Sequence, residues 1–302
     1  MLVTGGNGVI GKPLVDEIRR RGHEVWVVEP FQSNQDYFMK CDVRYYQDVE
    51  RVFKEHRFDY VFHLAAEFGR KNGEEHYQSL WETNAAGTRH VLAMQEEYRF
   101  RMIFPSSSEV YGINFPGVMT EKALEKYAPR LSNDYGLSKW VNEQQIMNSA
   151  ARTGTESVRW RFSNVYGPGE YYTPYRSVIC QFIYRALHDI PYTVNTSGTR
   201  AFLYIDDAMH TVVNIMENFK AGEVYNIANR KGYTMKQVSD KILALVGKDD
   251  KLVTYQSGDL IGTKVKDLDN TKAVRELGHK ETVKFDEGLR RTVQWFKDVY
   301  DV

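Results

Sequence analysis

The first 165 residues alternate short apolar runs with longer segments in which apolar residues recur every three or four positions. Short apolar runs bounded by polar residues are typical of buried parallel strands, and they occur at 1–3, 24–29, 37–41, 59–64, 101–104 and 157–162. The helical spacing occurs at 9–21, 46–56, 81–98 and 135–151. Strands that alternate with helices of this length predict an α/β fold with a Rossmann-type, doubly wound parallel sheet.

The pattern changes beyond residue 165, where aromatic-rich loops and shorter strands take over. Further helices are predicted at 178–188, 208–217, 235–246 and 285–299. We therefore expect a cofactor domain over residues 1–165 and a smaller, mixed α/β substrate lobe over residues 166–302. No long flexible linker separates the two in the sequence, so we treat this boundary as soft and expect the chain to be able to cross back.

A glycine-rich turn, Thr4-Gly5-Gly6-Asn7-Gly8-Val9-Ile10-Gly11, connects the first predicted strand to the first helix. Gly5 permits a tight turn, Gly8 lets the backbone approach a pyrophosphate, and Gly11 lets helix and strand pack closely. The first N–H groups of the helix, at the positive end of its dipole, then face an anion. Such a turn also occurs as an ordinary strand-to-helix connection, so by itself it is a weak signal for a dinucleotide.

Other polar or small residues follow directly after predicted strands, where doubly wound sheets bind their ligands. Glu29 ends the second strand about twenty residues after the glycines, where a carboxylate accepts hydrogen bonds from ribose hydroxyls and repels a 2′-phosphate. This position favours NAD over NADP, the alternative being a solvated acid at a strand end. Ala65 and Ala66, after the fourth strand, leave room for a flat ligand.

Tyr135 and Lys139 lie four residues apart and therefore on one face of a predicted helix. A nearby cation stabilises a phenolate, so the pair can form a general base that works near neutral pH. Taken alone, the pair is better explained by surface packing.

The composition indicates a globular protein with a small-molecule partner. The chain has 302 residues, 42% hydrophobic and 26% charged, and its 40 basic and 40 acidic residues give a formal net charge of zero. This balance provides no electrostatic footprint for nucleic acid or for an anionic membrane. Cys41 and Cys180 are far apart and His63 has no partner at metal spacing, so we expect no metal site. The sequence shows no apolar leader and no run of about 18 apolar residues, and we expect a cytoplasmic location.

Several of these features occur together in the order and approximate spacing of a known family. The glycine turn, Asp42, Ala65-Ala66, Asn84, Ser107 and the Tyr135/Lys139 pair resemble the extended short-chain dehydrogenase/reductases, in their nucleotide-sugar epimerase/dehydratase branch. The resemblance covers essentially the whole chain. It implies NAD as cofactor, a nucleotide sugar as substrate, and a homodimer formed through the helices near 81–98 and 135–151.

The resemblance also implies roles for individual residues. The pyrophosphate would lie on the glycine turn, Glu29 would bind the ribose, Lys139 would hold the nicotinamide ribose, and Ser107 would share the substrate hydroxyl with Tyr135. The implied cofactor set is Gly5, Gly8, Val9, Ile10, Gly11, Glu29, Asp42, Val43, Leu64, Ala65, Ala66, Asn84, Tyr135 and Lys139, with Asp42 and Val43 at the adenine.

The implied substrate residues are Glu67, Ser108, Asn164, Arg176 and Arg200. Asn164 would contact the sugar diphosphate, and the two arginines would clamp the diphosphate and the nucleotide, because guanidinium forks suit phosphate oxygens. A surface ion pair is the alternative for each arginine, and a local ion pair for Glu67. The tyrosines at 171, 172 and 175 could stack on a ligand or pack within their own loop.

The family's shared first step oxidises the C4 hydroxyl of the sugar, with Tyr135 as base, and the ketone acidifies the C5 proton. From it follow 4-epimerisation, 4,6-dehydration or decarboxylation. The resemblance implies catalytic roles for Ser107, Tyr135, Lys139 and Glu109. An acid at Glu109 is typical of dehydratases and uronic-acid decarboxylases, whereas 4-epimerases usually have a small residue there, so we favour C5 chemistry over plain 4-epimerisation.

Two departures from the family pattern leave the exact reaction open. Ser108 replaces an acid shared by dehydratases that act on thymidine-linked glucose, and Lys266 stands where decarboxylases have an arginine. A net reductase and a non-catalytic NAD-binding protein are the remaining alternatives. Glu29 disfavours the NADPH that such reductases often use, and the complete Ser107/Tyr135/Lys139 set disfavours a protein without activity.

Overall fold

The computed structural model describes residues 1–113, 115–257 and 267–302. Within these residues, seven parallel strands form a central sheet in the order β10-β6-β5-β4-β1-β2-β3. The strands are β1 Leu2–Thr4, β2 Trp26–Glu29, β3 Phe38–Lys40, β4 Tyr60–His63, β5 Arg101–Ser107, β6 Ser157–Phe162 and β10 Val224–Ile227. The order reverses between β1 and β4, so a crevice for a ligand opens at the carboxyl ends of these strands.

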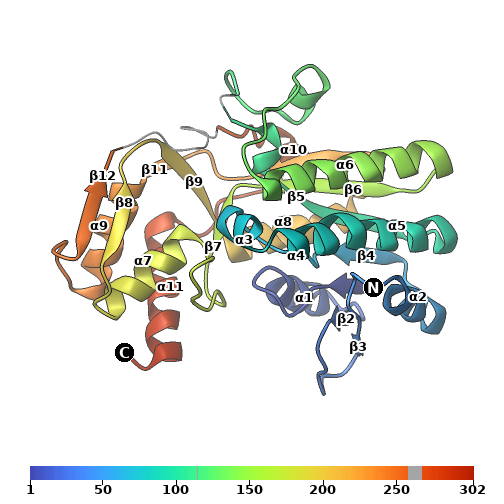
Figure 1. Cartoon of the computed structure of the whole chain (residues 1–302), viewed down its shortest axis with the longest axis horizontal. Helices are drawn as coiled ribbons and strands as arrows, with labels where there is room; N and C mark the ends of the chain where they lie inside the picture. Colours follow the sequence, from blue (N-terminus) through green and yellow to red (C-terminus); the bar gives the residue numbers. More distant parts are fainter. Residues whose placement is uncertain (114, 258–266) are drawn as a thin grey trace.

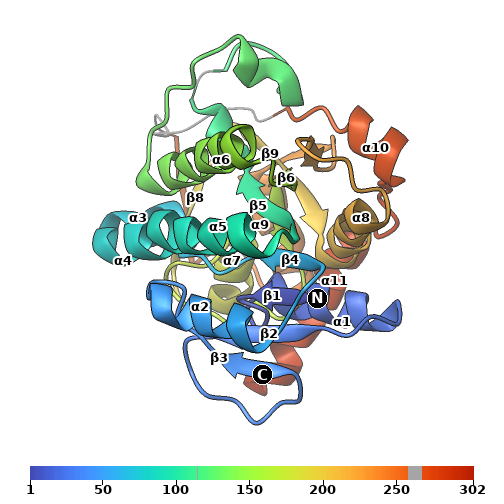
Figure 2. The same ribbon diagram turned by 90° about the vertical axis from the view of Figure 1, so that its right-hand side faces the viewer.

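Helices cover both faces of the sheet, as the alternating sequence pattern predicts. One face carries α2 (Tyr46–Glu55), α5 (Gly87–Tyr98) and α6 (Asp134–Thr153), and the other carries α1 (Gly11–Arg20), α8 (Ile205–Glu217) and α10 (Thr271–Leu277) (Figure 2). The predicted α/β fold with a Rossmann-type sheet is therefore confirmed. In the described residues, no helix has both the length and the apolar character needed to span a membrane.

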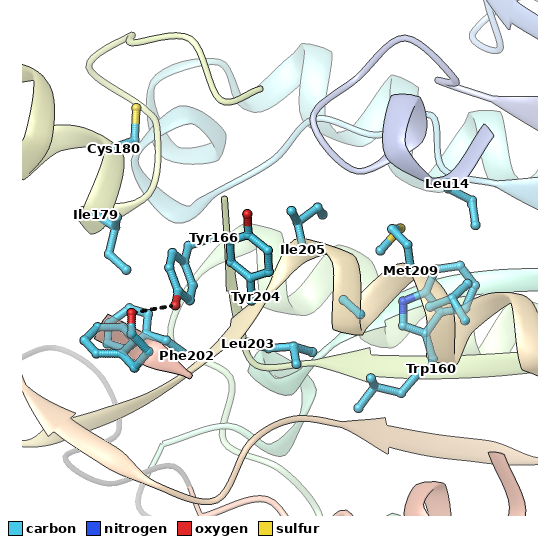
Figure 3. Packing of buried hydrophobic residues seen from close by; sticks show 14 of the residues in the cluster. Leu14, Trp160, Tyr166, Ile179, Cys180, Phe202, Leu203, Tyr204, Ile205 and Met209 are labelled. Carbon is cyan, nitrogen blue, oxygen red and sulfur yellow. Dashed lines mark hydrogen bonds between the residues drawn. The ribbon is translucent and has the colours of Figure 1, made fainter. Parts of the chain in front are cut away.

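Smaller elements form a lobe beside this sheet, at the left of Figure 1. A mixed sheet joins β7 (Asn164–Tyr166), β9 (Thr199–Tyr204) and β11 (Gly232–Thr234), and β8 (Tyr192–Asn195) pairs in parallel with β12 (Val253–Gln256). The helices of the lobe are α7 (Val178–Leu187), α9 (Met235–Val246) and α11 (Phe285–Tyr300). Buried side chains of β7, β9 and α8 form one hydrophobic cluster with Leu14 of α1 and Trp160 of β6 (Figure 3).

The two parts of the chain are interleaved. Three elements that follow residue 165 in the sequence, α8, β10 and α10, belong to the part of the fold built around the large sheet. β10 pairs with β6 in that sheet, and α8 packs on α1. Arg21, at the end of α1, donates hydrogen bonds of 2.7 Å to both Asn214 and Glu217 of α8. We propose a cofactor domain and a substrate lobe that share the chain in this interleaved way, with 165 as the point where it first leaves the large sheet.

Two predicted elements differ from the structure. The helix expected at 81–98 is three pieces: α4 (Tyr77–Trp81), the π-helical turn η1 (Glu82–Ala86) and α5. The strand expected at 101–104 continues to Ser107, because β6 is long enough to pair with it to that residue. Both differences lie beside the cleft described below, and π-helical turns occur frequently at functional sites.

Candidate functional site

A cavity of about 1010 Å³ opens at the carboxyl ends of the central strands and extends to the substrate lobe. It is lined by the glycine turn, by the residues that follow β2, β3, β4 and β5, by the start of α6, and by parts of β8, β9 and α7. The predicted site residues on its wall are Gly5, Gly8, Val9, Ile10, Gly11, Glu29, Asp42, Val43, Leu64, Ala65, Ala66, Glu67, Ser107, Ser108, Glu109, Tyr135, Lys139, Asn164, Arg176 and Arg200. Within the described residues, the cavity thus brings together every predicted position except Asn84.

The glycine turn forms a tight cradle at one end of the cavity. Gly5 has a φ of +69°, and a Cβ on it would lie 2.9 Å from the backbone nitrogen of Ala65. A Cβ on Gly11 would lie 2.1 Å from the carbonyl oxygen of Gly5, so this glycine packs against the turn itself and not, as predicted, against a strand. The glycine that contacts a strand is Gly6, which the sequence analysis did not single out and whose Cβ would lie 2.8 Å from Cγ1 of Val27. These contacts leave the backbone open to a pyrophosphate, so the cradle fits a dinucleotide.

Replacing Gly11 by alanine should disrupt this cradle. We expect the affinity for NAD to fall about 100-fold, because the overlap with the Gly5 carbonyl forces the turn to move where the pyrophosphate would bind. Isothermal titration with NAD would measure the change. The control is Gly247→Ala, at the left-handed end of α9, which should lower stability by about 1 kcal/mol and leave NAD affinity unchanged. Equal losses in both variants would contradict the prediction.

Glu29 and Asp42 line the part of the cavity that the resemblance assigns to the adenosine. Glu29 is 8% exposed, and its Oε1 accepts a hydrogen bond of 2.7 Å from the backbone N–H of Asn7. Burial raises the pKa of Glu29, and the Asn7 hydrogen bond opposes this rise. Asp42 accepts a hydrogen bond of 2.6 Å from Arg44, which also lines the cavity and lowers the pKa of Asp42. The sequence analysis missed Arg44, although it stands only two residues after Asp42.

The proposed catalytic pair lies at the start of α6. Asn133 caps this helix by accepting a hydrogen bond of 2.7 Å from the N–H of Gly136, which fixes the first turn and the Tyr135 side chain on it. Lys139 is 3% exposed and donates a hydrogen bond of 2.9 Å to the carbonyl oxygen of Pro105 in β5. Its Nζ lies 6.0 Å from the centre of the Tyr135 ring. Helix spacing therefore places both groups at the same part of the cavity, as predicted.

The titration behaviour of this pair differs from the sequence expectation. Burial raises the pKa of Tyr135, the charge of Glu109 raises it further, and a hydrogen bond with Ser107 lowers it. The net shift of the Tyr135 pKa is therefore upward, opposite to the direction expected from its pairing with Lys139. Burial itself, which a sequence pattern does not quantify, is the largest effect here.

Burial also lowers the pKa of Lys139, from 10.5 to about 8, and this predicts a pH dependence of stability. Between these pKa values the unfolded lysine keeps its proton while the folded one has lost it, so raising the pH favours the folded state. Relative to Lys139→Met, the free energy of unfolding of the wild type should rise by at most about 1.4 kcal/mol per pH unit in this window. Below it the difference should be constant. Urea unfolding at several pH values would test this, and a flat difference throughout would contradict it.

The carboxylate of Glu109 interacts electrostatically with both Tyr135 and Arg200. It belongs to the short 3₁₀ helix η2 (Ser108–Tyr111), and its backbone N–H donates a hydrogen bond of 3.2 Å to the Ser107 hydroxyl. Its Oε2 accepts a hydrogen bond of 3.2 Å from Asn133. The carboxylate also raises the pKa of both Tyr135 and Arg200 through its charge. It is therefore close to the predicted proton-transfer groups and faces the same cavity.

Asn84 lies behind the cavity wall, fully buried in the π-helical turn η1. Its side chain accepts a hydrogen bond of 2.8 Å from the N–H of Glu67 and donates one of 3.0 Å to Ser138 of α6. It therefore supports the wall, in contrast to the direct cofactor contact that the resemblance implies. The Glu67 carboxylate does reach the cavity, where it accepts hydrogen bonds from Asn72 and Ser79.

The substrate lobe contributes two guanidinium groups to the opposite wall. Nε of Arg176 is buried with no hydrogen-bond partner among the described residues. Arg200 donates a hydrogen bond of 2.9 Å to the carbonyl of Thr199, and burial lowers its pKa. Asn164 donates one of 3.0 Å to the carbonyl of Ala201. The sequence analysis missed Glu170, a buried cavity residue whose carboxylate holds the loop before α7 by accepting hydrogen bonds from Ser177.

The three loop tyrosines separate into two groups. Tyr172 stacks on Tyr184 with ring centres 3.8 Å apart, and Tyr171 packs edge-on against Trp295, so both pack within the lobe. Tyr175 lines the cavity, and its hydroxyl donates a hydrogen bond of 2.7 Å to Glu75.

Two further residues, His63 and Lys266, were also considered from the sequence. His63 is a core residue between Thr4 and Thr88, and burial lowers its pKa to about 3. Lys266 lies outside the described residues.

Comparisons with known proteins find relatives that match this chain over nearly its whole length. A sequence profile described as the NAD dependent epimerase/dehydratase family matches residues 1–228. The UDP-N-acetyl-alpha-D-glucosaminuronate decarboxylase of Bacillus cytotoxicus is 28% identical over 316 residues, covering 99% of this chain and 98% of the relative. The probable dTDP-glucose 4,6-dehydratase of Sinorhizobium fredii is 30% identical over 331 residues, covering 98% and 92%. Among solved structures, the UDP-glucose 4-epimerase of Thermotoga maritima with UDP-glucose superposes with a TM-score of 0.90 at 28% identity, covering 99% of each chain.

Proposed function

Because the chain belongs to the NAD dependent epimerase/dehydratase family, we propose that it oxidises C4 of a nucleotide-linked sugar transiently and then acts at C5 of the resulting ketone. The observation that carries this proposal is the position of Glu109, which faces the same cavity as Ser107, Tyr135 and Lys139. Relatives named as decarboxylases and as 4,6-dehydratases, both of which change the sugar beyond C4, support the same reaction class.

The residues around the cavity fit NAD along its length. The glycine cradle would hold the pyrophosphate, Glu29 would accept hydrogen bonds from the adenosine ribose, and Lys139 would hold the nicotinamide ribose. Bound NAD supplies a hydride acceptor for the first step and a hydride donor for the last. Because Glu29 is a buried carboxylate at the ribose position, it repels a 2′-phosphate, which supports NAD over NADP.

The protein's own groups then move the protons. Tyr135 takes the proton of the C4 hydroxyl, and Ser107 holds that hydroxyl in place. Glu109 removes the C5 proton when water is to leave from C5 and C6. In the decarboxylase case, it returns a proton to C5 after carbon dioxide has left. Arg176 and Arg200 would bind the diphosphate through their guanidinium forks.

A second candidate is 4-epimerisation, favoured by the close structural similarity to the UDP-glucose 4-epimerase of Thermotoga maritima. In that case the keto sugar turns within the cavity and takes hydride on its other face, and Glu109 has no chemical step to perform.

The test is to incubate the purified protein, without added cofactor, with UDP-glucose, UDP-glucuronic acid and dTDP-glucose, and to follow the product mass. Loss of water or of carbon dioxide supports C5 chemistry, and an unchanged mass with a new retention time supports the epimerase. Turnover only when external NAD(P)H is added in stoichiometric amounts would instead identify a net reductase.

We also propose a homodimer formed through α5 and α6. The exposed apolar side chains Tyr77, Leu137 and Met147 on α4 and α6 support a contact on this side of the sheet. Light scattering should give twice the chain mass for the wild type and a lower mass for Met147→Glu, whereas a monomeric wild type would contradict the proposal.

A further inference from the structure

A buried carboxylate lies behind the proposed catalytic residues and touches none of the cavity. Glu143 is on α6, four residues beyond Lys139, and its side chain is fully buried. Arg161 of β6, 3% exposed, donates two hydrogen bonds to it, from Nε to Oε1 at 2.9 Å and from Nη2 to Oε2 at 2.6 Å. This two-point contact fixes the guanidinium plane against the helix that carries Tyr135 and Lys139.

The pair remains ionised although it is buried. Burial raises the pKa of Glu143, but the hydrogen bonds and charge of Arg161, with the charge of Arg159 and a hydrogen bond from Ser106, outweigh this, and the net shift is downward. Removing two charges from water is costly, and apolar residues of the same volume often stabilise a core at least as well. A role in fixing geometry is therefore a better explanation for the pair than stability alone.

One arm of this network reaches β5. The Ser106 hydroxyl donates a hydrogen bond of 2.5 Å to Oε1 of Glu143. Ser106 stands between Pro105, whose carbonyl accepts the hydrogen bond from Lys139, and Ser107. The end of β5 that carries Ser107 is therefore tied to α6 through Glu143.

A second arm reaches the short helix that carries Glu109. Nη1 of Arg161 donates a hydrogen bond of 2.9 Å to the hydroxyl of Tyr111, which in turn donates one of 2.8 Å to Asn226 of β10. Tyr111 is fully buried and closes η2 two residues after Glu109. Glu143 itself lies on α6, the Ser106 arm reaches β5, and the Tyr111 arm reaches η2. The pair is thus connected to every element that carries a proposed catalytic group.

We propose that Glu143 and Arg161 are positioning residues that set the two proton-transfer steps separately: the Ser106 arm aligns Ser107 with Tyr135 for oxidation at C4, and the Tyr111 arm places Glu109 for the step at C5. This inference rests on the proposed function. It assigns a role to residues that contact neither the cofactor nor the sugar.

The experiment removes the hydrogen bonds of each arm with a substitution that leaves every charged residue in place. Ser106→Ala removes the first arm, Tyr111→Phe removes the second, and both keep the Glu143–Arg161 pair. The matched controls are Ser157→Ala, which loses a buried hydroxyl bonded to Gln95, and Tyr225→Phe, which loses one bonded to Glu276. The probe is whichever of UDP-glucose, UDP-glucuronic acid and dTDP-glucose the wild-type holoenzyme converts.

Two rates are measured on each protein. The appearance of reduced nicotinamide after mixing reports oxidation at C4, and deuterium entering C5 from heavy water, measured by mass spectrometry, reports the C5 step. Ser106→Ala should slow oxidation about tenfold and leave the ratio of the two rates unchanged. Tyr111→Phe should leave oxidation at the wild-type rate and slow C5 exchange about tenfold, so that reduced nicotinamide accumulates.

The proposal is overturned if each variant behaves like its control, or if both variants slow both steps equally, as a general loss of folding would. If the wild type converts none of the three sugars, the proposed function fails. The positioning role of the Glu143–Arg161 pair is then tested by measuring the affinity of the variants for NAD. Ser106→Ala should still weaken NAD binding relative to Ser157→Ala, because the Lys139 contact to Pro105 shifts with it. Equal NAD affinities in these two variants would reject the positioning role.

Discussion

Tyr135→Phe is expected to remove nearly all oxidation at C4, slowing the formation of reduced nicotinamide about thousandfold. The phenol is the group at the start of α6 that would take the C4 proton, and the variant removes that oxygen alone. The ring packs edge-on against Phe68 with centres 5.8 Å apart, a contact that phenylalanine keeps, so the fold should not change. Rapid mixing of the NAD-loaded variant with the converted sugar nucleotide would measure the rate.

The matched control is Tyr192→Phe, which removes a buried hydroxyl that is 2.9 Å from Ser239 in the substrate lobe. This variant should lose some stability but keep the wild-type rate of oxidation. Full turnover by Tyr135→Phe would contradict the assignment of the base, and with it the oxidative first step. Slow turnover with normal reduction of the nicotinamide would instead assign Tyr135 to a later step.

The large sheet could be predicted because its central strands are buried on both faces and the helices between them have one apolar face. The strand at 224–227 was not predicted, since Asn226 interrupts its apolar pattern. That side chain is fully buried, and hydrogen bonds to Tyr111, Met119 and Asp269 compensate its polarity. These partners are distant in the sequence, so no local pattern reveals that a polar residue belongs in a central sheet.

The same limit applies to the site. Gly5, Glu29, Ser107 and Tyr135 could be found because each lies where a strand ends or a helix begins, and local spacing indicates such places. The π-helical turn around Asn84 was not predicted, because its apolar spacing continues that of the neighbouring helix.

Contacts between distant segments could not be found in this way. Glu109, Tyr135 and Arg200 interact electrostatically although they belong to three separate segments. The raised pKa of Tyr135 has the same origin, because it results mainly from burial by the folded chain and not from the lysine four residues away.

Glu109→Gln separates the two halves of the proposed reaction. We expect oxidation at C4 to continue, and the entry of deuterium at C5 to fall about hundredfold or more, because the amide cannot exchange a proton with C5. Reduced nicotinamide and the keto sugar should then accumulate on the enzyme. The change also removes a negative charge that raises the pKa of Tyr135, so that pKa should fall and the pH at which oxidation becomes fast should move downward.

The control for this variant is Glu96→Gln, because Glu96 is a half-buried carboxylate outside the cavity that accepts a hydrogen bond of 2.8 Å from the Ser149 hydroxyl. It should leave both rates unchanged. If Glu109→Gln keeps the wild-type rate and its product differs from the substrate only at C4, Glu109 takes no part in the chemistry and the protein is a 4-epimerase. If oxidation itself is lost while NAD stays bound, the carboxylate acts on the C4 step through Tyr135. Only accumulation of the keto sugar supports Glu109 as the group that gives the enzyme its C5 reaction.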